Sequence, residues 1–411
     1  MKKGIQAAAS KAAVEGWAAR DVGADAGVLV DEHVDGHADE AKLFSVFAEP
    51  LDPSVAKLSL MCRMQGFGFD AKETFNEAEL GGVNNSSLAG NPLSIIDAEG
   101  VVFHHGPSCI AKWVGSETLA SLIPLLPQSP SIRILAFLLD FYVEELLTPA
   151  LRVYRFGSSS GEQELRSQFP TLSSHRMERH CWLNRQKRQL KLYGMHESNK
   201  AVTNAHVQRV LFQLDKQIRS SGYLSGTSPG YIDVTFYAPI YTFLYHQSFY
   251  RAELEEKFPA LVGWLKNLEN AGKLEGPPRE FISLSDPLLK ILNIIKLDCS
   301  SIVPALLNAY KQWLAEMEQE FHSLPAYIGM CTGVCMQQKM TRVVSVDFLW
   351  HMERITSQLA PLEGGYKAEV EALLKSAGLG LLFEQVQLFQ DRKLIFRDGH
   401  VYLESQPSNQ Y

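Results

Sequence analysis

The segment Gly90–Gly115, GNPLSIIDAEGVVFHHGPSCIAKWVG, decides the fold of the N-terminal part of the chain. Two apolar runs flank the turn dipeptide Glu99-Gly100, and this pattern predicts a β-hairpin. Gly106-Pro107 follows the second run and predicts a helix start, because proline is favoured in the first helical turn. The segment therefore predicts strand, turn, strand and helix in succession.

The residues before this segment extend the α/β pattern. Residues 42–50 predict a strand, and residues 69–75 predict a second strand. Between them, residues 52–67 predict a helix with Asp52 as its N-cap and Pro53 at its first position. The chain thus predicts a βαβ unit followed by a ββα unit.

Composition places the chain among ordinary globular proteins with two or three domains. It has 411 residues, of which 46% are hydrophobic and 21% charged. The net charge of −7 argues against a nucleic-acid-binding surface. The longest apolar stretch, residues 286–310, is interrupted by charged residues and Pro304, so amphipathic helices are expected rather than a membrane span.

The six cysteines are scattered through the chain, which favours a reducing, cytoplasmic compartment. Cys331 and Cys335 form a CxxxC pair, and on a helix this spacing would place both thiols on one face. No second pair follows at metal-ligand spacing, so two unpaired thiols are expected and no metal. Residues 1–41 are first alanine-rich and then acidic, and are read as a surface helix or extension.

The middle of the chain predicts helices. Residues 128–156 predict one long amphipathic helix after a proline-rich linker. A later helix ends at Gly222 and a new one starts at Gly230, with Asp233 at its third position. An acidic residue there can accept hydrogen bonds from backbone N–H groups of the preceding turn, so a structural role is predicted for Asp233.

The C-terminal third also predicts mainly helices. These are expected within residues 286–296, 300–324, 343–362 and 365–386. The chain closes with a predicted hairpin over residues 392–405. The expected fold class is therefore α+β with a predominance of helix.

Together these features resemble the glutathione S-transferase family, and more narrowly its long bacterial-type members with an extra C-terminal region. The likeness also rests on the segment Trp350–Ile355 and on six residues of the long helix: Asp140, Glu144, Pro149, Arg152, Tyr154 and Arg155. The resemblance implies a thioredoxin-like domain (42–115) and an all-helical domain (129–275). An N-terminal extension (1–41) and a C-terminal helical extension ending in a hairpin (285–411) would flank them.

The resemblance also implies a glutathione site. Asn91 would offer its backbone to the cysteinyl part of glutathione, next to a cis Pro92. The backbone N–H groups of Ser108 and Cys109 and the Ser108 hydroxyl would face the γ-glutamyl carboxylate, as anions bind at helix N-termini. Residues 106–107 stand where the family carries a polar pair, and they supply no side-chain donor.

Candidates for catalysis and substrate binding follow from the same resemblance. Ser54 is the hydroxyl at the first strand–helix junction, and it is either the residue that activates the thiol or an ordinary helix-start serine. The carboxylates of Glu49 and Asp52 nearby would oppose thiol ionisation. Tyr237 and Tyr241 either line an apolar substrate pocket facing the first domain or belong to the core.

Two functions remain open on the sequence alone. The first is thiol transfer to, or isomerisation of, an apolar electrophilic small molecule in the cleft between domains, with glutathione as cofactor. The second is a non-catalytic transferase-fold protein that binds a ligand or another protein through a degraded glutathione site. The expected partner is a small apolar molecule rather than nucleic acid or membrane, and the family resemblance leaves a homodimer open.

Overall fold

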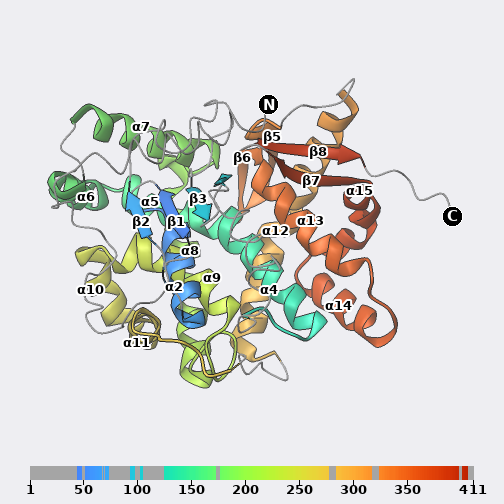
Figure 1. The fold of residues 1–411 in the computed structure, drawn as a ribbon, viewed down its shortest axis with the longest axis horizontal. Helices are drawn as coiled ribbons and strands as arrows, with labels where there is room; N and C mark the ends of the chain where they lie inside the picture. Colours follow the sequence, from blue (N-terminus) through green and yellow to red (C-terminus); the bar gives the residue numbers. More distant parts are fainter. Residues whose placement is uncertain are drawn as a thin grey trace, which may run out of the picture.

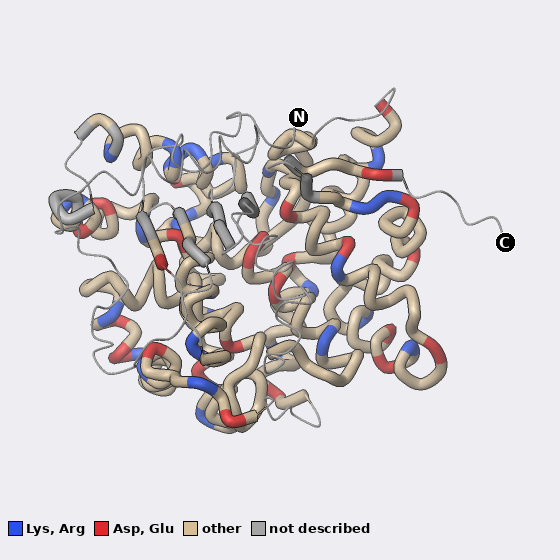
Figure 2. The backbone as a smooth tube through the Cα atoms, viewed as in Figure 1, with Lys and Arg blue, Asp and Glu red and all other residues tan. Residues whose placement is uncertain are grey.

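The computed structural model describes residues 44–48, 51–66, 68, 70–73, 93–97, 102–104, 125–172, 176–276, 284–316, 324–397 and 400–405. Within this part of the chain, the N-terminal strands lie on one side of the molecule and the C-terminal helices and hairpins on the other (Figure 1). Helices α4 (Pro130–Tyr142) and α12 (Asp286–Glu316) run between these two sides and carry much of the core. Lys, Arg, Asp and Glu occur along the elements in the middle of the molecule as well as at its edges (Figure 2).

The N-terminal strands form a four-stranded sheet in the order β2-β1-β3-β4. Strand β1 pairs in parallel with β2 and antiparallel with β3, and β3 pairs antiparallel with β4. The bounds are β1 Phe44–Ala48, β2 Asp70–Glu73, β3 Leu93–Asp97 and β4 Val102–His104. The predicted strands are confirmed, whereas the predicted turn at residues 99–100, the helix start at 106–107 and the extension 1–41 lie outside the described residues.

Helix α2 (Pro53–Gln65) follows β1 as the sequence predicted. The Asp52 carboxylate caps it by accepting a hydrogen bond from the Ser54 N–H at 2.8 Å. The helix ends at Gly66, whose φ of +83° is readily adopted only by glycine. Helix α2 then packs against α9 (Tyr231–Ile240) and so joins the sheet to the helical part of the chain.

The predicted long helix is present and contains a π-helical turn. Helix α4 (Pro130–Tyr142) continues through the π segment η2 (Val143–Leu147) into α5 (Thr148–Phe156). The helical part also contains α6 Ser159–Leu172, α7 Arg176–Leu192, η3 Glu197–Asn199, α8 Lys200–Ser221, η4 Tyr241–Tyr245, α10 Ser248–Lys257 and α11 Pro259–Glu269. Single π turns inside α-helices are frequent at functional sites, so η2 is a candidate position for functional residues.

The C-terminal part differs from the prediction in two places. The two helices expected in residues 286–324 are one helix, α12 (Asp286–Glu316), which contains Pro304. Residues 343–345 belong to strand β6, so the helix predicted from 343 begins at Val346. The elements are β5 Tyr327–Cys335, β6 Gln338–Ser345, α13 Val346–Leu359, α14 Gly364–Ser376, η5 Gly380–Gln385, α15 Val386–Gln390, β7 Arg392–Arg397 and β8 His400–Ser405.

The hairpin β5–β6 corrects the reading of the CxxxC pair. Cys331 and Cys335 lie on a strand rather than a helix, and both thiols are buried. They share one strand face because side chains alternate with a period of two. That face packs on α12, and a Cβ added at Gly333 would come within 3.0 Å of the Ile302 Cα. Glycine therefore permits the close approach of strand and helix.

Helix α12 is the described helix that is long and apolar enough to cross a membrane by length and composition. Half of its most apolar window is buried inside the fold. A buried core helix passes the same test, so this composition is weak evidence for a membrane span.

Candidate functional site

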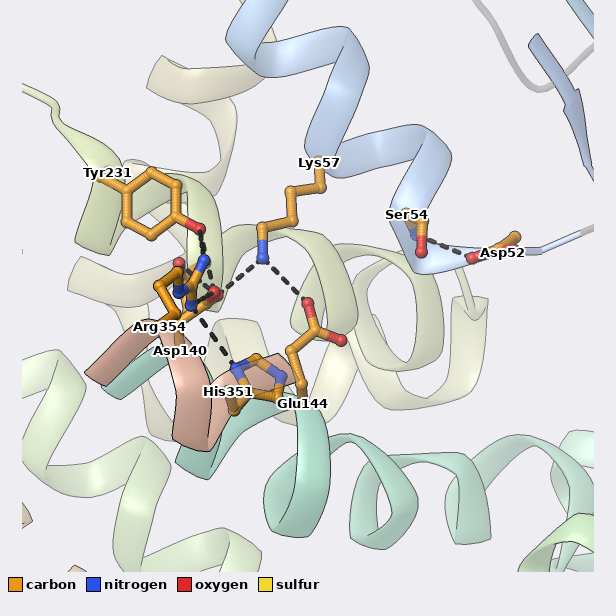
Figure 3. Close-up of polar contacts among 9 residues, drawn as sticks. Asp52, Ser54, Lys57, Asp140, Glu144, Tyr231, His351 and Arg354 are labelled. Carbon is orange, nitrogen blue, oxygen red and sulfur yellow. Dashed lines mark hydrogen bonds and ion pairs between the residues drawn. The ribbon is translucent and has the colours of Figure 1, made fainter. Parts of the chain in front are cut away.

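A buried ionic cluster lies where α2 meets the helical part of the chain and α13 (Figure 3). Its members come from α2 (Lys57), α4 (Asp140), η2 (Glu144), α9 (Tyr231) and α13 (Arg354). The Lys57 Nζ donates to Asp140 Oδ1 at 2.6 Å and to Glu144 Oε1 at 2.9 Å. One lysine of α2 thus binds both carboxylates of the long helix.

The Asp140 carboxylate is the centre of the cluster. Besides Lys57, it accepts hydrogen bonds from the Tyr231 hydroxyl at 2.9 Å, the Thr235 hydroxyl at 3.0 Å and the Arg354 guanidinium. Burial alone would raise the pKa of Asp140, but the charges of Lys57 and Arg354 hold it well below its usual value. Asp140 therefore remains ionised and fully hydrogen-bonded.

Glu144 forms the outer edge of the cluster. Its side chain is 14% exposed, whereas those of Lys57 and Asp140 are 2% exposed. Burial raises the pKa of Glu144, and the charges of Asp140 and Asp52 raise it further, against the effect of Lys57. Among these partners, Glu144 is the one that both approaches solvent and is most easily protonated.

His351 lies beside the cluster and carries no charge at neutral pH. The residue is 4% exposed, and its ring meets the Phe141 ring edge to face, with centroids 6.0 Å apart. Burial and the neighbouring Arg354 lower the pKa of His351 to about 3. Two cations, Lys57 and Arg354, are therefore balanced by the two carboxylates alone.

Ser54 lies one helical turn before Lys57 on α2. Its side chain is buried, and Figure 3 shows Ser54 and Asp52 at the start of the helix, beside the ionic cluster but not part of it. The other predicted glutathione ligands, Asn91, Pro92, Ser108 and Cys109, lie outside the described residues, so their roles remain predictions.

Tyr237 and Tyr241 stack on each other with ring centroids 4.8 Å apart, close to α2. Tyr237 is buried against Trp264, and the half-buried Tyr241 donates its hydroxyl to Glu269 Oε1 at 2.8 Å. The Arg63 guanidinium of α2 donates to the Glu269 backbone carbonyl in the same region. The two tyrosines therefore lie close to α2, and Tyr241 is the more accessible; their place in a substrate pocket remains a prediction.

The sequence singled out Asp140 and Glu144 without their partners. One feature of the sequence could have indicated their partner: Lys57 stands on α2 next to the buried Leu58 and near the buried Met61, and a buried lysine needs an acidic partner. Arg354 stands within the segment Trp350–Ile355 that the family resemblance had marked. No sequence pattern predicted that residues 57, 140 and 354 lie in contact with one another.

The remaining charged residues of the long helix have structural partners. Arg152 donates to Gln189 Oε1 at 2.5 Å, and Arg155 donates to Gln168. Both arginines are buried in α5. Within the described part of the chain, no group of three or more His, Cys, Asp or Glu side chains could hold a metal ion.

The predicted role of Asp233 is confirmed. Its carboxylate accepts hydrogen bonds from the backbone N–H groups of Leu224 at 2.7 Å, Ser225 at 2.9 Å and Gly230 at 3.1 Å. It also accepts one from the Trp264 indole N–H at 2.8 Å. Asp233 thus fixes the turn before α9, the helix that carries Tyr231 into the ionic cluster.

Comparison with known proteins finds one segment of the chain that matches a family model. Residues 186–271 match the sequence model of the glutathione S-transferase C-terminal domain, and these residues include α8, α9 and α11. No curated protein sequence matches the chain. Residues 186–271 thus resemble a glutathione S-transferase C-terminal domain, which agrees with the resemblance predicted from the sequence.

The chain also has a weak similarity to several solved structures, which are distant in sequence. A glutathione S-transferase from Pseudomonas fluorescens Pf-5 is 16% identical (TM-score 0.33), with 59% of this chain and 100% of that chain covered. One from Rhodospirillum rubrum F11 is 15% identical (TM-score 0.35), with 58% and 97% covered. Ure2p5 from Phanerochaete chrysosporium, cocrystallized with 1-(S-glutathionyl)-2,4-dinitrobenzene, is 12% identical (TM-score 0.29), with 68% and 100% covered.

Proposed function

We propose that this chain binds glutathione or a closely related thiol at the edge of its N-terminal sheet, as a ligand-binding member of the transferase fold. The observation that carries the proposal is the packing of α2 against α9. Helix α9 lies inside the region that matches the transferase family, so this contact joins the sheet to a transferase-like domain. The order β2-β1-β3-β4 supports a thioredoxin-like domain over residues 42–115 and a helical domain over 129–275.

The charges near Ser54 favour binding without catalysis. A transferase must stabilise a thiolate, and neighbouring carboxylates oppose a second negative charge. Asp52 caps α2 through the Ser54 N–H, which removes one of the donors that would otherwise face an anion. The Asp52 charge also contributes to the raised pKa of Glu144, so both carboxylates act on the same region.

Thiol transfer or isomerisation on an apolar electrophile is the second candidate. It is favoured by the place of Ser54 in the first turn of α2, where unpaired N–H groups and the helix dipole lower the pKa of a nearby thiol. The apolar substrate would then contact Tyr241 and, behind it, Tyr237.

Location in a reducing, cytoplasmic compartment is part of the proposal. Cys62, Cys181, Cys299, Cys331 and Cys335 are free thiols in the structure. Secreted proteins of this size more often pair such residues in disulfides.

Glutathione binding is tested by thermal unfolding. At a glutathione concentration ten times the dissociation constant, binding stabilises the fold by about 1.4 kcal/mol. We expect a rise in Tm of about 2 °C at millimolar glutathione, without conjugation of a generic aromatic electrophile. Oxidised glutathione and free cysteine are the control ligands, which test whether the rise in Tm requires the reduced tripeptide. An unchanged Tm would contradict the binding proposal, and conjugation would favour the second candidate.

The role of Ser54 is tested by Ser54→Ala. If thiol transfer occurs, loss of a hydroxyl that stabilises the thiolate should reduce kcat by at least about tenfold, because general catalytic contacts of this kind contribute 10²–10⁴-fold. Under the binding proposal, the variant changes neither Tm nor the glutathione-dependent shift by more than about 1 °C. Ser59→Ala, at a half-buried position later on the same helix, is the control.

A further inference from the structure

A second buried polar group lies outside the candidate site. It consists of Tyr142 from α4, His206 from α8 and Asp298 from α12, and all three side chains are buried. The Tyr142 hydroxyl is 2.8 Å from His206 Nε2 and 3.4 Å from Asp298 Oδ2. His206 Nε2 is 3.3 Å from the same Asp298 oxygen. Three helices distant in sequence thus meet at one carboxyl group.

The other oxygen of Asp298 holds the turn of the hairpin β5–β6. Asp298 Oδ1 accepts a hydrogen bond from the Met336 N–H at 3.0 Å. Met336 and Gln337 have φ values of +52° and +61°, a backbone region that residues other than glycine adopt at an energetic cost. Ser301 of α12 accepts a second hydrogen bond from the hairpin, from the Val334 N–H at 3.0 Å. The strained turn is therefore held by α12.

No cation forms an ion pair with the Asp298 carboxyl among the described residues. The groups that face it are Tyr142, His206 and the exposed Arg209 from α4 and α8, with Cys299 beside it on α12 and Cys335 from β5. Burial raises the pKa of Asp298 to about 7, and burial lowers that of His206 to about 4. The two groups are consequently uncharged together in weakly acidic solution.

The base of the same hairpin is fastened next to the ionic cluster. Arg342 of β6 donates to the Glu145 backbone carbonyl at 2.7 Å and to its carboxylate, and the Ser345 hydroxyl donates to that carboxylate at 2.9 Å. Glu145 is the neighbour of Glu144 in the π segment η2. A change in the docking of the hairpin therefore acts on the segment that carries the outer carboxylate of the candidate site.

We propose that Asp298 is a pH-sensitive latch, a side chain that holds the β5–β6 hairpin on α12. Its ionisation loosens the hairpin from α12 and thereby alters the position of η2 at the candidate site. Hydrogen bonds from the Met336 N–H and the Tyr142 hydroxyl favour the ionised carboxyl, but its burial outweighs them, and no described cation forms an ion pair with it in the closed state. The carboxylate gains water when the hairpin opens. Opening therefore becomes more favourable as pH rises, while protonated Asp298 stays neutral and closed.

The sign of the effect follows from proton linkage. The pKa of Asp298 is higher in the closed than in the open state, so opening releases a proton between the ordinary carboxyl pKa and about 7. The opening equilibrium should rise by up to about tenfold per pH unit in this interval. Above about pH 7 it should level off, because both states are then ionised.

Hydrogen exchange of the full-length protein without ligand tests the latch. Protection factors of amides in residues 327–345, corrected for the intrinsic pH dependence of exchange, are measured from pH 5 to 8. We expect them to fall by at least about tenfold up to pH 7, while amides of α9 remain constant. In Asp298→Asn the protection should not depend on pH. Constant protection in the wild-type chain, or an equal fall in Asp298→Asn, would overturn the proposal.

Tyr142→Phe supplies a second, more conservative variant. It keeps the ring in the core and removes a hydroxyl that lowers the pKa of Asp298. The pH midpoint of hairpin opening should therefore move upward by about half to one unit. An unmoved midpoint in a folded Tyr142→Phe protein would contradict the role of the triad even if Asp298→Asn fails to fold. Because no ligand is present, both results are independent of glutathione binding.

Discussion

Lys57→Met is expected to lower the free energy of unfolding by about 3–5 kcal/mol, the usual cost of removing one partner from a buried ion pair. The substitution keeps the length of the side chain in α2 but leaves the half-buried Glu144 without its cation, and Asp140 with Arg354 as its remaining cation. Urea unfolding monitored by circular dichroism measures the effect. The exposed Lys290→Met is the matched control and should change stability by less than about 0.5 kcal/mol.

A double variant separates the loss of the Lys57–Glu144 attraction from the cost of leaving the Glu144 carboxylate unpaired. In Lys57→Met/Glu144→Gln the uncompensated carboxylate is removed, so part of the stability should return. A double variant as unstable as the sum of both single variants would mean that Lys57 and Glu144 do not interact, contrary to the structure.

Acid should have an effect similar to that of the Lys57 substitution. The pKa of Asp140 is depressed in the folded state, so its contribution is present above the ordinary carboxyl pKa. That contribution is lost as pH falls toward the lower folded value.

Asp233→Ala is expected to destabilise the protein by about 3–5 kcal/mol, because four donors lose a buried acceptor at once. Asp233→Asn keeps one acceptor oxygen and should fall between the wild type and the alanine variant. Thermal and urea unfolding measure the differences. The exposed Asp391→Ala provides the control.

A second readout ties Asp233 to the candidate site. Since the capped turn positions α9 and hence Tyr231, Asp233→Ala should also reduce the glutathione-dependent rise in Tm. An alanine variant within about 1 kcal/mol of the wild type would show that solvent replaces these hydrogen bonds in full.

The sequence predicted correctly those elements whose formation depends on neighbouring residues. Asp52-Pro53 predicted the start of α2, and the apolar runs around residues 93–104 predicted the pairing of β3 with β4. The hairpin β5–β6 was missed because its turn uses Met336 and Gln337 in place of glycine or asparagine. A turn held by a distant carboxylate leaves no turn signal in the sequence.

The candidate site shows more clearly that contacts between residues distant in sequence are not predicted by local patterns. Asp140 and Glu144 were picked out, but an ion pair between residues 57 and 140 depends on how α2 packs against α4, which no spacing along the chain encodes. Asp233 was predicted correctly because its partners Leu224, Ser225 and Gly230 lie within nine residues. The glutathione ligands of the N-terminal domain, Asn91 among them, remain predictions.

The two adjacent glutamates of η2 bear on how the chain could be divided. Glu144 faces Lys57 of the N-terminal part, whereas Glu145 is bound by Arg342 and Ser345 of the C-terminal part. A shortened chain that stops after α11 would leave Glu145 without either donor and Asp140 without Arg354. The region that resembles transferases is therefore not structurally self-sufficient: without the C-terminal third, a buried carboxylate of the long helix would have no donor.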